Sequence, residues 1–240
     1  ISEVYKPRLK VTVVSEHDKK IISNALGIIK NIYQINFDYE KFLGVAECDR
    51  RIYQLANKYL GLRPPRTVSF HEALVDSIVE QNINLKFATV VKSRLVKNWG
   101  MSLKIKGVEY FAFPKPEQLA FVKPEELKSK VRATLRKAET IISVSESAMK
   151  NSLPTIEDVK RNPEAVINEL VKIKGIGTWT AEMAIAKVAE DFKIGPAGDL
   201  AVKRGFAKVL GVKDENQIRD IMKELGNYGG LVLYLMALEK

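Results

Sequence analysis

Asp199 is the residue of this chain best suited, by its type and its surroundings, to do chemistry. It closes the segment Gly195-Pro-Ala-Gly-Asp199, which predicts a flexible loop that delivers a carboxylate to the start of a helix. A carboxylate at that point can cap the helix, or it can stabilise positive charge and handle a proton during a reaction. The spacing leaves both roles open, and they are compatible, because the helix start can hold the side chain in place.

Scarce residue types narrow the chemistry further. Cys48 is the only cysteine, which excludes a disulfide framework within the chain and a four-cysteine iron–sulfur cluster. His17 and His71 are the only histidines, so a zinc site of histidine and cysteine ligands is disfavoured. His71 stands in Ser69-Phe-His-Glu72, a capping-box pattern that predicts a surface histidine in the first turn of a helix. Carboxylates, lysines and tyrosines are therefore the expected catalytic groups.

A second candidate feature is the turn Gly175-Ile-Gly177. The pattern predicts a helix that ends at Lys172 or Ile173, a turn with Ile176 pointing inward, and a second helix from Thr178. Glycines allow backbone conformations that a Cβ forbids, and the N–H groups of such a turn form an anion pocket. A DNA phosphate fits there without base specificity. An ordinary tight turn between two helices has the same pattern, so the glycines alone do not decide between the two.

The charge of the chain favours a polyanionic partner. Lys and Arg number 39 against 29 Asp and Glu, which gives a net charge of +10 and a pI near 9.5. Nucleic acid is the expected partner, and an acidic membrane surface is the lesser option. The longest apolar run, Leu231–Leu238, is far shorter than the roughly 18 residues that span a bilayer. No signal peptide is apparent, so we expect an intracellular protein of the cytoplasm or nucleoid, with no membrane partner.

The elements that must position these residues are mostly helices. Apolar spacing and capping residues predict helices over 19–33, 39–60, 70–81, 85–99, 135–148, 163–171, 178–189, 199–210 and 229–239, with a short helix opening at Pro124. The β-branched run Leu9–Val14 predicts a strand, and residues 100–115 predict a long connection. The expected fold class is mainly α, with a small α/β segment at the N-terminus.

Several motifs together resemble one family. Leu170-x4-Gly175-Ile-Gly177-Thr-Trp-Thr-Ala181, followed by Asp199-Leu-Ala-Val-Lys-Arg-Gly-Phe206, resembles the helix-hairpin-helix (HhH-GPD) DNA glycosylase superfamily, and within it the AlkA-type 3-methyladenine DNA glycosylases. Further matching segments are Gly61-Leu-Arg63, Ser69–Glu72 with Gln81, Phe111–Pro116 and Arg132–Glu139. The resemblance covers about residues 40–240. It implies that residues 39–240 form two helical subdomains flanking a cleft, and that residues 1–38 are the remnant of a small β-rich domain.

The resemblance also implies roles in a reaction. Asp199 takes the position of the family's essential aspartate, which stabilises positive charge on the deoxyribose and orients or deprotonates the attacking water. Bifunctional members carry a nucleophilic lysine where this chain has Trp179, so water is the implied nucleophile and an abasic site the product. Trp179, Met183 and Tyr228 are the implied lining of a pocket for a flipped, cationic base. Met183 departs from an aromatic in the bacterial enzymes, and a core tryptophan is the competing interpretation of Trp179.

The loop after the 70–81 helix and three groups of phosphate-contacting residues are the implied DNA contacts. The loop after the 70–81 helix is Gln81-Asn-Ile-Asn84, in which Gln81 is an implied DNA contact and either Ile83 or Asn82 fills the gap left by the flipped base. Phosphate contacts are expected from the hairpin (Lys174, Gly175, Gly177, Thr178), from the basic run 130–137 with Arg132 and Arg136, and from Lys203 and Arg204. No cofactor and no metal bound by side chains is expected, apart from a monovalent cation at the hairpin when DNA is bound.

The expected function is a monofunctional DNA glycosylase of base excision repair. It would act as a monomer on damaged double-stranded DNA and hydrolyse the N-glycosidic bond of alkylated purines such as 3-methyladenine and 7-methylguanine. Two alternatives stay open: the same fold acting on hypoxanthine, uracil or 8-oxoguanine, and a non-catalytic helix-hairpin-helix DNA-binding protein. The Asp199 loop favours an enzyme, because a bare binding module needs no acid at that position.

Overall fold

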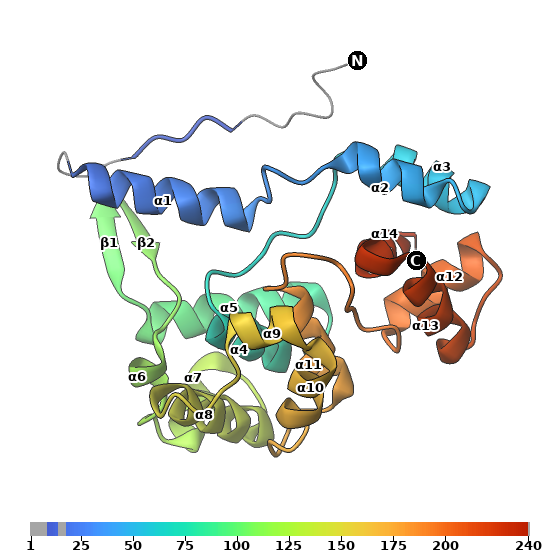
Figure 1. Ribbon diagram of the computed structural model, residues 1–240. Helices are drawn as coiled ribbons and strands as arrows, with labels where there is room; N and C mark the ends of the chain where they lie inside the picture. Colours follow the sequence, from blue (N-terminus) through green and yellow to red (C-terminus); the bar gives the residue numbers. More distant parts are fainter. Residues whose placement is uncertain (1–8, 14–17, 240) are drawn as a thin grey trace. The chain divides into compact units, whose positions relative to one another are not determined.

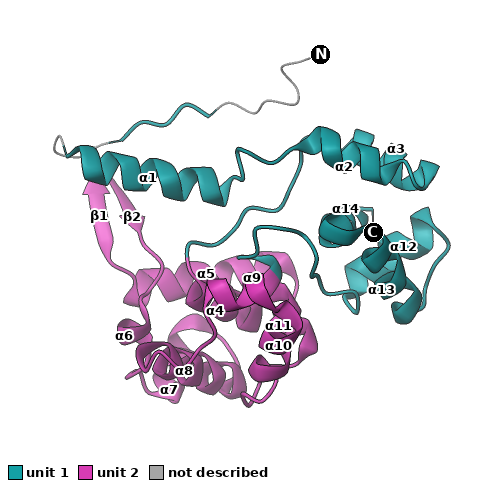
Figure 2. Ribbon diagram, in the orientation of Figure 1, with its two compact units in different colours: residues 1–68, 186–240 teal, residues 69–185 magenta. Residues whose placement is uncertain are grey.

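The computed structural model describes residues 9–13 and 18–239 and shows a mainly helical protein (Figure 1). It divides into two compact units, which are described separately (Figure 2). Unit 1 comprises residues 1–68 and 186–240, and unit 2 comprises residues 69–185. Among the described helices, none combines the length and the apolar character that a membrane crossing requires.

Unit 2 is built around one long helix, α8 (Leu135–Met149), which packs against α4, α6 and α7. Leu74, Ile78, Leu127 and Ile141 are completely buried in this core. The other elements of the unit are α4 (Phe70–Glu80), α5 (Leu85–Trp99), β1 (Ser102–Ile105), β2 (Val108–Phe111), α6 (Pro116–Leu119), α7 (Pro124–Val131), α9 (Ile156–Arg161), α10 (Pro163–Leu170) and α11 (Thr178–Ala186).

Unit 1 joins segments from the two ends of the chain. Helix α14 (Gly229–Ala237) packs against α12 (Leu200–Val209), α13 (Glu215–Glu224) and α3 (Arg50–Lys58). A Cβ at Gly205 would lie 1.8 Å from the carbonyl oxygen of Met236, so only glycine lets α12 approach α14 this closely. The unit also contains α1 (Lys19–Ile32), α2 (Tyr39–Ala46) and a 3-10 turn, η1 (Gly226–Tyr228). Phe42, Phe206, Ile218 and Leu231 form the centre of its core.

Most predicted helices are confirmed, because local capping residues set their starts. The side chains of Ser69, Asn84, Thr134, Asn162 and Asp199 each accept a hydrogen bond from a backbone N–H two or three residues later. The helix predicted over 85–99 has exactly those bounds in α5. The one predicted over 178–189 ends earlier, at Ala186.

Two of the predicted segments differ in the structure. The helix predicted over 39–60 is interrupted at residues 47–49, because the Asp49 carboxylate caps a new helix, α3. The connection predicted over 100–115 contains the antiparallel hairpin β1–β2, whose turn residues Lys106 and Gly107 both have positive φ. Helices α6, α9 and α13 were not predicted.

The strand predicted over Leu9–Val14 is not observed in the residues that can be described. Leu9–Val13 have no strand partner, and Val14 lies outside the described residues. A strand requires a neighbour to accept and donate its backbone hydrogen bonds. The single pairing found within the described ranges is that of β1 with β2.

His71 is buried rather than exposed as its capping-box position suggested. It is 7% exposed, and its Nε2 lies 2.9 Å from the Ser145 hydroxyl of α8. Burial lowers the pKa of His71 to about 4, so the ring is neutral and unsuited to act as a base that gains a proton near neutral pH.

Candidate functional site

Gly175 and Gly177 of the hairpin turn differ in backbone conformation and in the space that a side chain would have. Helix α10 ends at Leu170, slightly before the predicted end, and α11 begins at Thr178 as predicted. Gly175 has a φ of +96°, and a Cβ there would lie 2.0 Å from the Thr140 hydroxyl. Gly177 has open space around its Cα, which leaves its backbone accessible to a ligand. Ile176 is 5% exposed, which confirms that the residue between the glycines points inward.

Two side chains of other helices hold the hairpin in place. The Gln81 amide nitrogen donates to the Gly175 carbonyl at 2.9 Å and to the Thr180 hydroxyl at 2.8 Å. The Thr140 hydroxyl lies 3.3 Å from the Lys174 carbonyl oxygen. Gln81 was predicted as a DNA-contacting residue at the start of the loop; its side chain supports the hairpin, and its contact with DNA stays a prediction. Neither Thr140 nor Thr180 was singled out from the sequence, since no local pattern links residues so far apart.

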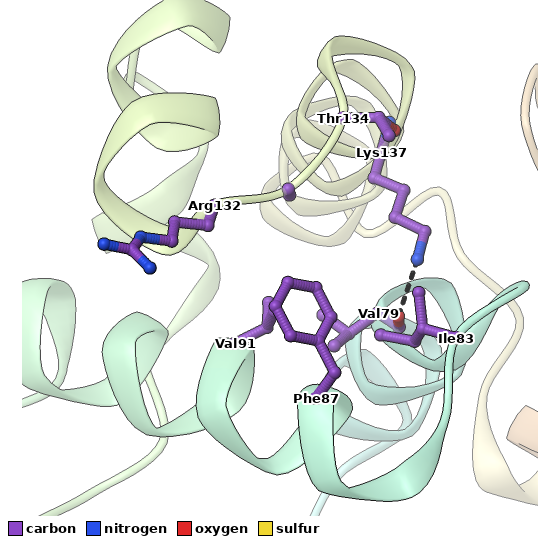
Figure 3. A pocket seen from close by; sticks show the side chains of 8 residues that line it. Val79, Ile83, Phe87, Val91, Arg132, Thr134 and Lys137 are labelled. Atoms are coloured by element: carbon purple, nitrogen blue, oxygen red, sulfur yellow. Dashed lines mark hydrogen bonds between the residues drawn. The ribbon is translucent and has the colours of Figure 1, made fainter.

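The loop after α4 presents two different side chains. Asn82 is exposed and has a φ of +51°, a left-handed conformation that asparagine tolerates better than most residues. Ile83 is half-buried and borders a cavity of about 140 Å³ together with Val79, Phe87 and Val91 (Figure 3). Both residues stay candidates for filling the gap of a flipped base.

The basic run between α7 and α8 contains residues in two kinds of environment. Arg132 and Arg136 are exposed, and Figure 3 shows the Arg132 guanidinium turned away from Ile83. Arg132 follows the last residue of α7 and caps the helix with a φ of +60°. Lys137 is half-buried, and its ammonium donates to the carbonyl oxygens of Val79 and Gln81. The arginines are therefore available to a phosphate, whereas the Lys137 ammonium is engaged by backbone.

Trp179 and Met183 lie one turn apart on α11. This spacing places their side chains on the same face of the helix, and both are half-buried. The three intervening residues, Thr180, Ala181 and Glu182, are buried. The structure therefore brings Trp179 and Met183 together as two neighbours on one helical surface of unit 2.

Tyr228 belongs to an aromatic cluster of unit 1. Its ring centroid lies 6.1 Å from that of Phe37 and 5.5 Å from that of Phe42. It lines a cavity of about 530 Å³ within this unit, together with Phe37, Phe192 and Asn227. Apart from Phe37, Phe192 and Tyr228, the residues that line the cavity are polar or charged. Because Tyr228 and Trp179 belong to different units, the predicted three-residue base pocket stays a prediction.

Asp199 caps α12 with its side chain. One carboxylate oxygen accepts hydrogen bonds from the backbone N–H groups of Ala201, at 2.8 Å, and Val202, at 3.2 Å. The side chain is half-buried, and the preceding residues Gly195, Pro196 and Ala197 are buried. The loop is thus packed rather than flexible as the glycines suggested. The capping role is confirmed, and it fixes the orientation of a carboxylate that a reaction could use.

Lys203 forms an ion pair within the protein, whereas Arg204 is exposed. The Lys203 ammonium forms an ion pair with the Glu215 carboxylate at 2.9 Å, and the same carboxylate binds Arg219. The two cations also hold the pKa of Glu215 below its usual value. Arg204 is exposed on the neighbouring position of α12. Of the two predicted phosphate contacts, Arg204 is therefore the more accessible.

No cation-binding cluster is present among the described acidic, histidine and cysteine residues. The monovalent cation expected at the hairpin would use backbone carbonyls, and the Gly175 carbonyl already accepts from Gln81. That expectation stays a prediction.

Known proteins share both the sequence pattern and the fold. The family model described as HhH-GPD superfamily base excision DNA repair protein matches residues 75–229. A DNA-3-methyladenine glycosylase of Bacillus subtilis is 31% identical over 163 residues, which are 67% of this chain and 54% of that protein. The chain spans about half the length of the curated relatives it matches.

Solved structures of low sequence identity have the same fold. The 3-methyladenine DNA glycosylase of Archaeoglobus fulgidus has a TM-score of 0.80 at 21% identity, covering 93% of this chain and 77% of that one. Schizosaccharomyces pombe Mag1, solved with abasic DNA, has a TM-score of 0.66 at 23% identity, covering 82% and 95%. The matched region contains Gln81, the hairpin, Trp179 and Asp199. The chain therefore belongs to the HhH-GPD superfamily of base excision DNA repair proteins.

Proposed function

We propose that this protein is a monofunctional DNA glycosylase that flips alkylated purines out of duplex DNA and hydrolyses their N-glycosidic bonds. The observation that carries the proposal is the Asp199 carboxylate, which two backbone N–H groups fix at the start of α12. Breaking an N-glycosidic bond develops positive charge on the deoxyribose, and a fixed carboxylate stabilises that charge without reorganising. The Bacillus subtilis relative, named a DNA-3-methyladenine glycosylase, supports the substrate class.

Trp179 supports the monofunctional character of the proposed enzyme. An indole cannot form the imine through which a lysine at this position would cleave the strand, so water is the nucleophile and an intact strand with an abasic site is the product. The half-buried indole can instead stack on a cationic purine, a contact worth about 0.5–2 kcal/mol. The exposed cations Arg132, Arg136 and Arg204 and the open backbone at Gly177 fit the phosphates of a duplex.

The substitution Asp199→Asn tests the proposed role of the carboxylate, and Asp214→Asn is its matched control. Asparagine also caps helices, so the variant removes the charge and keeps the cap. We expect base release to fall roughly 100-fold or more while binding to a damaged duplex is retained. Asp214 caps α13 with the same geometry, since it accepts from the N–H groups of Asn216 and Gln217. Asp214→Asn should leave base release unchanged, and full activity of Asp199→Asn would refute the mechanism.

A panel of single-lesion duplexes decides the substrate. Duplexes carrying 3-methyladenine, 7-methylguanine, hypoxanthine, uracil or 8-oxoguanine would be incubated with excess protein, and the released base measured. The proposal expects release of the two methylated purines. Release of another base only would favour the same fold with a different specificity. Binding without release from every duplex would favour a non-catalytic DNA-binding protein.

A further inference from the structure

We propose that Lys137 is a positioning residue that presents the loop of Gln81–Asn84 to DNA, rather than a phosphate contact. The inference rests on the proposed function. It differs from what the position of Lys137 in the basic run suggests, because its ammonium turns inward (Figure 3).

The contacts of the ammonium carry the inference. Lys137 stands in the first turn of α8, and its Nζ donates to the carbonyl oxygens of Val79, at 2.8 Å, and Gln81, at 2.6 Å. These are carbonyls at the end of α4, where the backbone acceptors have no partner within their own helix. A cation at the carboxyl end of a helix also interacts favourably with the helix dipole. Lys137 therefore closes the end of α4 from another helix.

The loop is held at both ends, and of its two middle residues Asn82 is exposed and Ile83 is half-buried. At its start, Gln81 is held through its carbonyl by Lys137 and through its side chain by the hairpin. At its end, the Asn84 side chain accepts from the Phe87 N–H at 2.9 Å and caps α5. Only Asn82 and Ile83 lie between these anchors. The anchors thus select one geometry for the two residues that are the candidates to enter the duplex.

Helix α8 couples this loop to the hairpin. Thr140 follows Lys137 by three positions, so the two side chains lie on one face of the helix. Thr140 approaches the Lys174 carbonyl, and Lys137 binds the Gln81 carbonyl. The loop and the hairpin, two of the elements of unit 2 expected to contact DNA, are therefore tied to the same helical turn.

Burial distinguishes Lys137 from its neighbours. Arg132 and Arg136 are exposed, whereas Lys137 is half-buried, and burial lowers the pKa of its ammonium. Moving this ammonium to a phosphate would leave two backbone carbonyls without their donor. We therefore expect its removal to slow the step in which the loop enters the duplex, without removing a contact to the DNA backbone.

The test compares three lysine variants. Lys137→Met removes the donors, Lys137→Arg keeps a charged donor, and Lys150→Met removes an exposed lysine from the other end of α8. Base release is measured in single turnover at several protein concentrations, and duplex binding is measured across salt concentrations. We expect Lys137→Met to release base roughly tenfold more slowly at saturation, with an unchanged salt slope. We expect Lys137→Arg to recover most of the rate and Lys150→Met to match the unmodified protein.

Two outcomes would overturn the inference. A salt slope that falls by about one unit in Lys137→Met would identify a phosphate contact. An unchanged rate at saturation would remove any positioning role. Should Lys137→Met lose its cooperative thermal transition, Lys137→Gln, which keeps one donor group, replaces it with the same criteria. If the unmodified protein releases no base from any duplex, the proposed function itself fails. If the unmodified protein is active and Lys137→Met has the same rate, only the positioning role of Lys137 fails.

Discussion

Replacing Gly175 and Gly177 by alanine, one at a time, tests whether the turn requires glycine at position 175 but not at position 177. Gly175→Ala introduces a Cβ at a φ of +96°, a conformation that costs an L-residue about 1–3 kcal/mol. The same Cβ would lie 2.0 Å from the Thr140 hydroxyl, so Thr140 must move. The Thr140 hydroxyl donates to the Arg136 carbonyl at 2.8 Å and lies 3.3 Å from the Lys174 carbonyl, so the loss of this longer contact costs at most about 1 kcal/mol. The free energy of unfolding should fall by about 1–4 kcal/mol in total.

Gly177→Ala is the matched variant, because it adds the same methyl group to the same turn. Nothing lies within 4 Å of a Cβ at Gly177, and its φ is not in the left-handed region. Its unfolding free energy should change by no more than about 0.5 kcal/mol, while duplex binding weakens if a phosphate approaches this backbone. Urea denaturation followed by circular dichroism measures the stabilities. Equal losses of stability in the two variants would refute the distinction between the glycines.

A double substitution tests whether the Thr140 side chain restricts residue 175. In Gly175→Ala combined with Thr140→Ala, the obstructing hydroxyl and methyl group are absent, and the backbone strain at residue 175 and the 3.1 Å approach of the residue 140 Cβ remain. The two substitutions should therefore be less than additive in a double-mutant cycle, with a coupling of about 0.5–3 kcal/mol. Additive effects would show that Thr140 does not restrict residue 175.

Three further predictions follow from other contacts. Gln81→Ala leaves the Gly175 carbonyl and Thr180 hydroxyl without this donor, and should lower the unfolding free energy by about 1–3 kcal/mol; an unchanged urea midpoint would contradict this. Because the folded pKa of His71 is about 4 against 6.5 in an unfolded chain, the unfolded state binds more protons between these values, and stability should decrease as pH falls from 6.5 towards 4. Comparison with His71→Asn over this range isolates the effect, and parallel pH profiles of the two proteins would contradict it. Replacing sodium or potassium by tetramethylammonium at equal ionic strength should weaken duplex binding if a monovalent cation joins the hairpin to phosphate; equal affinities in the two salts would count against that cation.

Much of the fold could be predicted because its signals are local. A capping side chain lies within three residues of the N–H groups that it satisfies, so Ser69, Asn84, Thr134 and Asn162 mark helix starts within a short stretch of sequence. The same holds for Asp199 and for the inward Ile176 between the two glycines. The hairpin β1–β2 was missed although Lys106-Gly107 is a turn signal and Ser102-Leu-Lys-Ile105 alternates polar and apolar residues, because each strand has only four residues, the shortest run over which such alternation is informative.

The amino-acid sequence by itself determined the helical class, the hairpin turn, the capped aspartate and the family to which these motifs belong. Only the tertiary structure decided that Gln81 supports a hairpin 94 positions away, that Lys137 closes the end of α4, and that His71 is buried against Ser145. It also decided that the segments around Phe42 and Leu231, from opposite ends of the chain, share one core. The physical reason is that caps and turns are satisfied within a few residues of backbone. The partner of a long side chain, in contrast, depends on which distant helix the packing of apolar faces brings beside it.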